Sequence, residues 1–158
     1  MATLKSLSEP IGKTLQVTTG VLFLVCGCSI YLLFRSTTLN IYQWCSAIGF
    51  STSIDAMREY TQTWELPDFV RYCLPDGLYC AAYLLIMDAV WKGDNSLLKY
   101  IVLSIVPFVT ISSELLQYGG FVPGTFDIYD LLSYSIPVVI YIIYNSRLLC
   151  LTLNTQCL

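Results

Sequence analysis

Five polar residues stand in or beside long apolar stretches of this chain, and their side chains are the ones that can do chemistry. They are Asp76, Glu114, Gln117, Asp127 and Asp130. An ionisable side chain within an apolar helix is costly and marks a candidate functional site. Carboxylate and amide groups gathered at one level can accept hydrogen bonds from a polar ligand, which makes these five residues a candidate binding site.

Helix capping is the alternative interpretation of three of these acids. Asp127 and Asp130 match the N-cap and N3 positions of a helix start, and Asp76 lies at the beginning of another helix. An acid there also suits the helix dipole, so capping and ligand binding both stay open for these residues. Glu114 lies near a helix C-terminus, where the dipole disfavours an anion, and is therefore the strongest candidate for a functional role.

The composition places these residues in a membrane protein. The chain has 158 residues, of which 56% are hydrophobic and only 12% are charged, and its mean hydropathy is +0.65. An ordinary soluble domain carries about 25% charged residues. The sequence therefore predicts an all-α integral membrane protein, with residues 1–158 forming a single membrane domain.

Four segments are apolar enough and long enough to cross a bilayer, which takes about 20 residues. We expect these spans over residues 14–34, 72–91, 97–118 and 128–147, forming a four-helix bundle. The polar segment 36–71 is expected to form an outer loop with two short amphipathic helices on the membrane surface. A signal peptide with lipid attachment at Cys28 is the alternative for the first segment, although its apolar run continues past that residue.

The positions of lysine and arginine predict that both termini lie in the cytoplasm. The inner side would then hold Lys5, Lys13, Lys92, Lys99 and Arg147, and the outer side would hold Arg35, Arg58 and Arg71. The five candidate residues fall on the outer side, where arginines can pair with them, so we add Arg58 and Arg71 to the candidate binding site. Within the second span, Asp88 precedes Lys92 by four residues, a spacing typical of a structural ion pair.

Residue types also argue against several partners. No cluster of lysine and arginine offers a nucleic-acid footprint. The chain has no histidine, and its seven cysteines form no pair of C-x-x-C motifs, so we expect no zinc site, no cofactor and no catalytic residues. A magnesium or calcium ion held by oxygen ligands alone stays open, as does a disulfide between Cys45 and Cys73.

Two stretches resemble the signature of the VanZ-like family. They are Glu114-Leu115-Leu116-Gln117-Tyr118 and Gly124-Thr125-Phe126-Asp127-Ile128-Tyr129-Asp130-Leu131-Leu132, in which Glu-x-x-Gln ends one helix and Asp-x-x-Asp opens the next. Members of this family are small bacterial multi-spanning membrane proteins, and the family takes its name from an accessory protein of glycopeptide antibiotic resistance. The resemblance covers residues 72–144 and implies a role in the cell envelope, in the bacterial inner membrane. The family often has an Arg before its Asp pair and a His in an upstream helix, and this chain has neither.

Three functions are consistent with these observations. The first is an envelope protein that binds a membrane lipid headgroup, a lipid-linked glycan or an amphipathic antibiotic at the outer polar residues. The second is an oligomeric channel, an effector or an accessory subunit of a membrane complex, in which Thr110, Glu114 and Gln117 line a cavity from one helix face. The third and least favoured is an intramembrane enzyme that uses paired carboxylates as acid and base.

Overall fold

The computed structural model describes the backbone of residues 2–61 and 63–156, and the side chains of residues 12–61 and 63–145. Within these residues every regular element is a helix, as the sequence predicts. The order is α1 (Ala2–Phe34), α2 (Asn40–Ala47), α3 (Ser51–Thr61), the π-helical turn η1 (Phe69–Cys73), α4 (Leu74–Val90), α5 (Leu97–Tyr118) and α6 (Ile128–Gln156). The side chains of Lys5 and Arg147, which contribute to the predicted orientation, and the last two residues of the predicted fourth span lie outside the described side chains.

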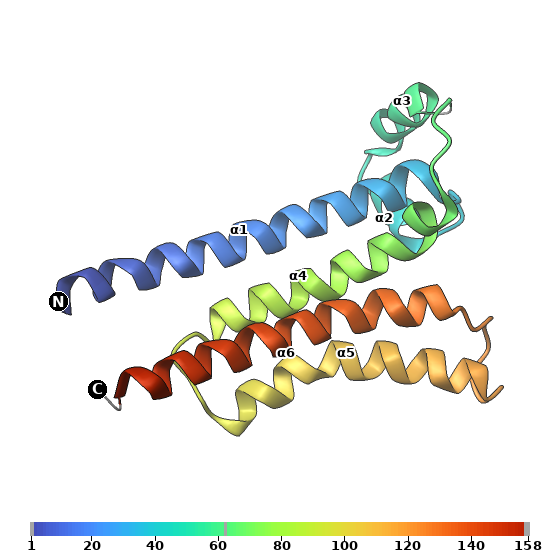
Figure 1. Ribbon diagram of the computed structural model, residues 1–158. Coiled ribbons are helices and arrows are strands. Elements are labelled where there is room, and N and C mark those ends of the chain that lie inside the picture. Colours follow the sequence, from blue (N-terminus) through green and yellow to red (C-terminus); the bar gives the residue numbers. More distant parts are fainter. Residues whose placement is uncertain (1, 62, 157–158) are drawn as a thin grey trace.

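Among the described residues, four helical stretches are long and apolar enough to cross a membrane, which confirms the predicted number. They are Gly12–Phe34, Phe69–Val90, Leu97–Tyr118 and Ile128–Asn145. The second begins at Phe69 rather than at residue 72, because η1 continues directly into α4. Figure 1 shows the four long helices packed together, with both termini at one end of the bundle and α2 and α3 at the other. We call these the terminal end and the loop end.

Helix α4 occupies the centre of the bundle, where it contacts α1, α5 and α6. It has small residues where the other helices approach: Ala82 is fully buried, and a Cβ on Gly77 would lie 2.9 Å from the carbonyl oxygen of Ser133 in α6. Gly20 and Gly27 of α1 face α4 in the same manner. Small residues allow the close backbone approach on which helix association depends when lipid, not water, surrounds the helices.

Helix α1 packs against the bundle around Cys28, the residue considered as a lipid attachment site. Cys28 lies inside the helix, and its Sγ is 2.9 Å from the hydroxyl oxygen of Tyr79 in α4. The preceding residue, Gly27, faces the backbone of Pro75 at the start of α4. These contacts favour a spanning helix over a signal peptide for this segment.

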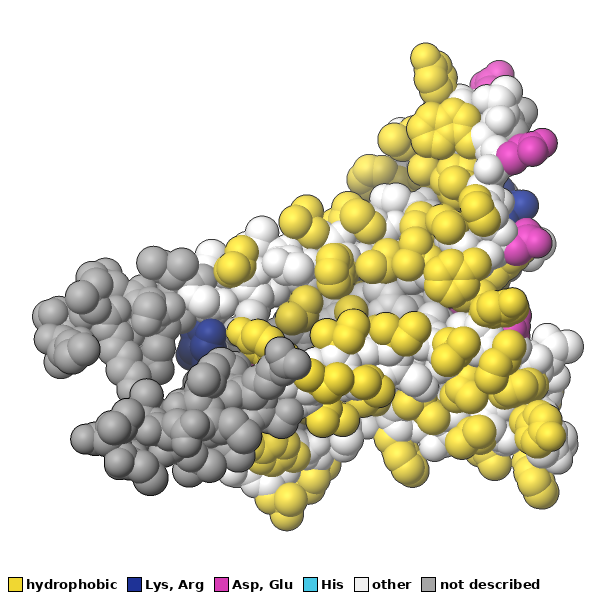
Figure 2. All heavy atoms as spheres, in the orientation of Figure 1, with side chains coloured by type: hydrophobic (Ala, Val, Ile, Leu, Met, Phe, Trp, Pro, Cys, Tyr) yellow, Lys and Arg dark blue, Asp and Glu magenta, His cyan; other side chains and the backbone are white. Residues whose placement is uncertain are grey.

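The outward surface of the long helices is apolar. Hydrophobic side chains cover the face shown in Figure 2 along these helices, and acidic side chains appear at the loop end. Large side chains such as Leu22, Phe108 and Ile140 are more than half exposed. Contiguous apolar surface of this kind is rare on soluble monomers, whereas a helix surrounded by lipid requires it.

A polar network joins all four long helices near the terminal end. The carboxylate of Asp88 in α4 forms an ion pair with Lys99 of α5 at 2.9 Å and accepts hydrogen bonds from Tyr141 of α6 and Gln16 of α1. Lys92, the predicted partner of Asp88, donates instead to the side-chain oxygen of Gln16 at 3.1 Å. Asp88 therefore has a structural role with a different ionic partner, because the short connection between α4 and α5 brings Lys99 alongside it.

The segment between α1 and α4 contains the two short helices that the sequence predicts. Helix α3 contacts α1 and buries Ile54. The hydroxyl of Tyr42 in α2 donates to the carboxylate of Asp55 in α3 at 2.7 Å, and this hydrogen bond raises the pKa of Tyr42 because it favours the neutral phenol. Cys45 and Cys73 are free thiols, so the disulfide that the sequence left open is not formed.

Candidate functional site

The π-helical turn η1 places Asp76 inside a continuous helix. The last hydrogen bond of η1 runs from the Leu74 amide to the carbonyl of Phe69, five residues earlier. Pro75 follows, and because it has no amide hydrogen it fits where the regular i to i−4 pattern is already interrupted. A helical turn thus precedes Asp76, so this residue does not cap a free helix end, contrary to the capping interpretation. Its carboxylate remains for other contacts.

Three helices bring carboxylates together at the loop end. We define the acidic cluster as Asp76 of α4, Glu114 of α5, and Asp127 and Asp130 at the start of α6. The carboxylate of Asp76 lies close enough to those of Glu114 and Asp130 to interact with their charges, and Glu114 interacts likewise with Asp127 and Asp130. The backbone amide of Asp127 also donates to the Glu114 carboxylate, which ties α5 to the beginning of α6.

Two carboxylate oxygens of the acidic cluster are buried without a hydrogen-bond partner among the described residues. One is Oε2 of Glu114, a residue only 7% exposed, and the other is Oδ1 of Asp130. Asp127 differs, since its Oδ1 accepts the backbone N–H of Tyr129 at 2.8 Å, which confirms its capping role. Buried polar atoms are normally satisfied, so these two oxygens, which no described residue donates to, mark a place where a ligand can bind.

Gln117 lies against the connection between α5 and α6. In that connection Gly124 has a φ of +146°, and a Cβ there would lie 2.7 Å from the side-chain carboxamide of Gln117. Both the backbone conformation and the close contact therefore favour glycine. Gln117 supports the turn that sets Glu114 beside Asp127, which is a positioning role.

Arg35 is the arginine that approaches the acidic cluster. Its guanidinium lies over the rings of Tyr31 and Tyr72, 4.5 and 5.2 Å from their centroids, and donates to the Tyr31 hydroxyl and the Tyr72 carbonyl. It interacts with the charge of Asp76, yet the ion pair present among the described side chains is that of Lys99 with Asp88. Among the described side chains, the acidic cluster therefore has four carboxyl groups and one arginine beside it.

Arg58 and Arg71 do not reach the acidic cluster, contrary to the expected pairing. Arg58 donates to the carbonyl oxygens of Leu32 and Arg35 at 2.6 and 2.7 Å, and Arg71 donates through Nε to that of Phe34 at 2.6 Å. The last carbonyls of a helix have no helical partner and carry the negative end of its dipole. Both arginines therefore cap the C-terminus of α1 because that helix end offers them acceptors at close range.

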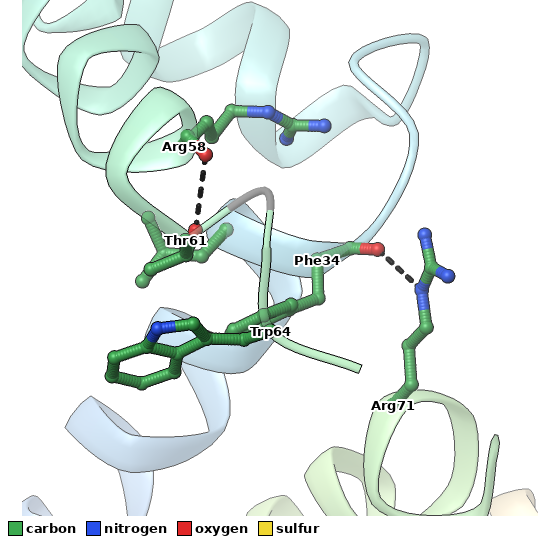
Figure 3. Close-up of a pocket in the computed structure, with 6 residues that line it drawn as sticks. Phe34, Arg58, Thr61, Trp64 and Arg71 are labelled. Atoms are coloured by element: carbon green, nitrogen blue, oxygen red, sulfur yellow. Dashed lines mark hydrogen bonds between the residues drawn. The ribbon is translucent and has the colours of Figure 1, made fainter. Parts of the chain in front are cut away.

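The two arginines also line a pocket of about 270 Å³ at the loop end (Figure 3). Its other walls come from Leu33, Phe34, Thr61 and Trp64. Arg71 uses Nε for the bond to α1, so its two terminal nitrogens can still bind an anion. The pocket combines positive charge with an aromatic and aliphatic wall.

An apolar groove of about 200 Å³ runs between α4 and α6 in the same half of the bundle. Phe69, Gly77, Ser133 and Pro137 are among its lining residues. Gly77 directly follows Asp76 in the chain, so the groove and the acidic cluster are built on the same turns. An apolar groove beside polar groups suits a ligand with a hydrocarbon portion.

Comparison with protein-family models, with characterised proteins and with solved structures found no match for this chain. A helical bundle by itself does not specify a function, so the function has to be argued from the residues of the site.

Besides Arg35, two residues at the site were not among the candidates drawn from the sequence. The Sγ of Cys73 lies within 4.8 Å of carboxylate oxygens of Asp127 and Asp130, and Tyr134 lies beside Asp76. Helical spacing could have identified both, because Cys73 precedes Asp76 by three residues and Tyr134 follows Asp130 by four.

Proposed function

We propose that this chain is an integral membrane protein of the VanZ-like kind that binds the polar headgroup of a membrane amphiphile at the acidic cluster. The amphiphile is a lipid, a lipid-linked glycan or an amphipathic antibiotic. In this proposal the loop end faces the outer surface of a bacterial inner membrane and both termini lie in the cytoplasm.

The observation that carries the proposal is the convergence of Asp76, Glu114, Asp127 and Asp130 from three helices, with orphaned oxygens on Glu114 and Asp130. A ligand with hydroxyl or amine groups supplies hydrogen-bond donors for these two oxygens, which have no partner among the described residues. Hydrogen bonds to charged groups contribute about 1.5–3 kcal/mol each. The ligand therefore gains most of its specificity from these two carboxylates.

Two neighbouring features support an amphiphile over a water-soluble ligand. The apolar groove between α4 and α6 offers a surface for a hydrocarbon chain next to the acidic cluster. The pocket of Arg58 and Arg71 offers positive charge at the same end of the bundle, where a phosphate of the headgroup region would lie.

Native mass spectrometry of the detergent-purified protein tests the proposal through co-purified amphiphile. Glu114→Gln and Asp130→Asn are compared with wild type, and Glu59→Gln serves as the matched control because Glu59 is an exposed glutamate on α3. We expect wild type and the control to retain the amphiphile, and each site variant to retain at least about tenfold less, as the loss of one charged hydrogen bond implies.

Equal retention in all four proteins contradicts the proposal. A stable higher oligomer without any ligand, unaffected by Glu114→Gln, would support the oligomeric channel instead. The orientation is checked separately by treating intact cells with a membrane-impermeant maleimide. If the loop end faces outward, Cys45 of α2 is labelled in wild type, and Cys45→Ser carries less label than wild type.

A further inference from the structure

Three potential metal ligands from separate elements meet at the acidic cluster. Cys73 is the last residue of η1, Asp127 precedes α6, and Asp130 lies in the first turn of α6. One ligand atom from each, the thiol sulfur and two carboxylate oxygens, all lie within 4.8 Å of one another. Cys73 is only 3% exposed, whereas Asp127 and Asp130 are half-buried, so the group reaches from the interior to the surface of the bundle.

A second, independent observation indicates a cation at this place. Glu114 is 93% buried, its Oε2 has no hydrogen-bond partner among the described residues, and its carboxylate interacts with the charges of Asp127 and Asp130. Burying an anion without a compensating positive charge costs several kcal/mol, and gathering four carboxylates adds repulsion to that cost. A divalent cation reduces both penalties at once, because it binds carboxylate oxygens and neutralises two negative charges.

We propose that Cys73, Asp127 and Asp130 bind a zinc-class divalent ion, whose charge also offsets that of the neighbouring Glu114 carboxylate. A thiolate among the ligands selects zinc over magnesium or calcium, which prefer oxygen alone. Ligand atoms of a tetrahedral zinc ion lie about 3.5 Å apart, so the three donors need to close by about 1 Å around the ion. Binding releases the thiol proton of Cys73 to solvent, since the thiolate is the ligand.

The inference deepens the proposed function and rests on it for the biological role of the site. Four carboxylates repel a phosphate, which most lipid headgroups and lipid-linked glycans carry. A bound divalent ion offsets that charge and offers an anionic headgroup a direct partner. Metal binding by the chain can nevertheless be measured without any headgroup present.

The test uses the full-length protein in a lipid-free detergent, stripped of metal with a chelator. Zn²⁺ affinity is measured by competition with a chromophoric chelator for wild type, Cys73→Ser and Asp130→Asn. Cys80→Ser is the matched control, because Cys80 is also a buried thiol, in the helix α4 that continues η1, but lies outside the group. Co²⁺ added to wild type provides a second readout, since a cobalt–thiolate bond gives a near-ultraviolet charge-transfer band.

We expect one Zn²⁺ per chain, a thiolate band with Co²⁺, and binding at least about tenfold weaker in Cys73→Ser and Asp130→Asn but not in Cys80→Ser. Absence of the Co²⁺ band in wild type overturns the inference even if a variant fails to fold. Equal affinity of wild type and Cys73→Ser overturns it as well. If the protein binds metal but the site variants retain as much amphiphile as wild type, the inference stands and the proposed function is contradicted. If amphiphile retention depends on Glu114 but no metal binds, the proposed function stands and the inference is overturned.

Discussion

The buried ion pair of Asp88 and Lys99 provides a quantitative test of how the bundle is held together. The two side chains are each 12% exposed and lie 2.9 Å apart, and the Asp88 carboxylate also accepts hydrogen bonds from Tyr141 and Gln16. A double-mutant cycle with Asp88→Asn, Lys99→Met and the combination separates the pair from the rest of the network.

The expected magnitudes follow from what each change leaves behind. Removing one partner of a buried pair costs about 3–5 kcal/mol, because the other charge remains uncompensated. We expect about 3 kcal/mol for Asp88→Asn, at the lower end, since Lys99 lies in the first turn of α5 and can extend toward the headgroup region. We expect about 2 kcal/mol for Lys99→Met, because Tyr141 and Gln16 still donate to Asp88. The double variant should also cost about 3 kcal/mol, which gives a coupling energy of about 2 kcal/mol.

The assay is equilibrium unfolding in mixed micelles with increasing sodium dodecyl sulfate, followed by circular dichroism and tryptophan fluorescence. Lys13→Met, a lysine of α1 outside this network, is the control and should change stability by less than about 0.5 kcal/mol. A coupling energy below about 0.5 kcal/mol would refute the assignment of Asp88 and Lys99 as a coupled pair.

Two further predictions concern helix packing and the loop end. Gly77→Ala places a Cβ 2.9 Å from the carbonyl oxygen of Ser133 and should lower the free energy of unfolding in the same assay by about 1–3 kcal/mol. Gly27→Ala is the control, because its Cβ meets ordinary contacts from 3.4 Å and should be tolerated. Equal effects of the two substitutions would contradict the close crossing of α4 and α6. Arg58→Ala removes two hydrogen bonds to the end of α1, and Arg71→Ala removes one. Limited proteolysis of the segment between α1 and α4 should therefore accelerate more in Arg58→Ala than in Arg71→Ala. The opposite order would contradict the capping roles.

The sequence by itself determined the class of the fold and the position of most elements. Long apolar runs between charged segments are sufficient to predict four long helices, because a chain in lipid must satisfy its backbone hydrogen bonds internally. The helices of the segment between α1 and α4 and the capping role of Asp127 followed from local patterns in the same way. The position of Glu114 near a helix end also marked it from the sequence, since no local interaction explains an acid there.

Only the tertiary structure decided which side chains meet. Asp88 pairs with Lys99 rather than Lys92, and Arg58 caps α1 rather than neutralising the acidic cluster, because partners on neighbouring helices compete with those nearby in sequence. Cys73 joined the candidate site for the same reason: the π-helical turn and the packing of α4 against α6 bring its sulfur to Asp127, far along the chain. Periodicity reports the face on which a residue lies, but the distance between two faces depends on how closely the helices pack, which small residues such as Gly77 control.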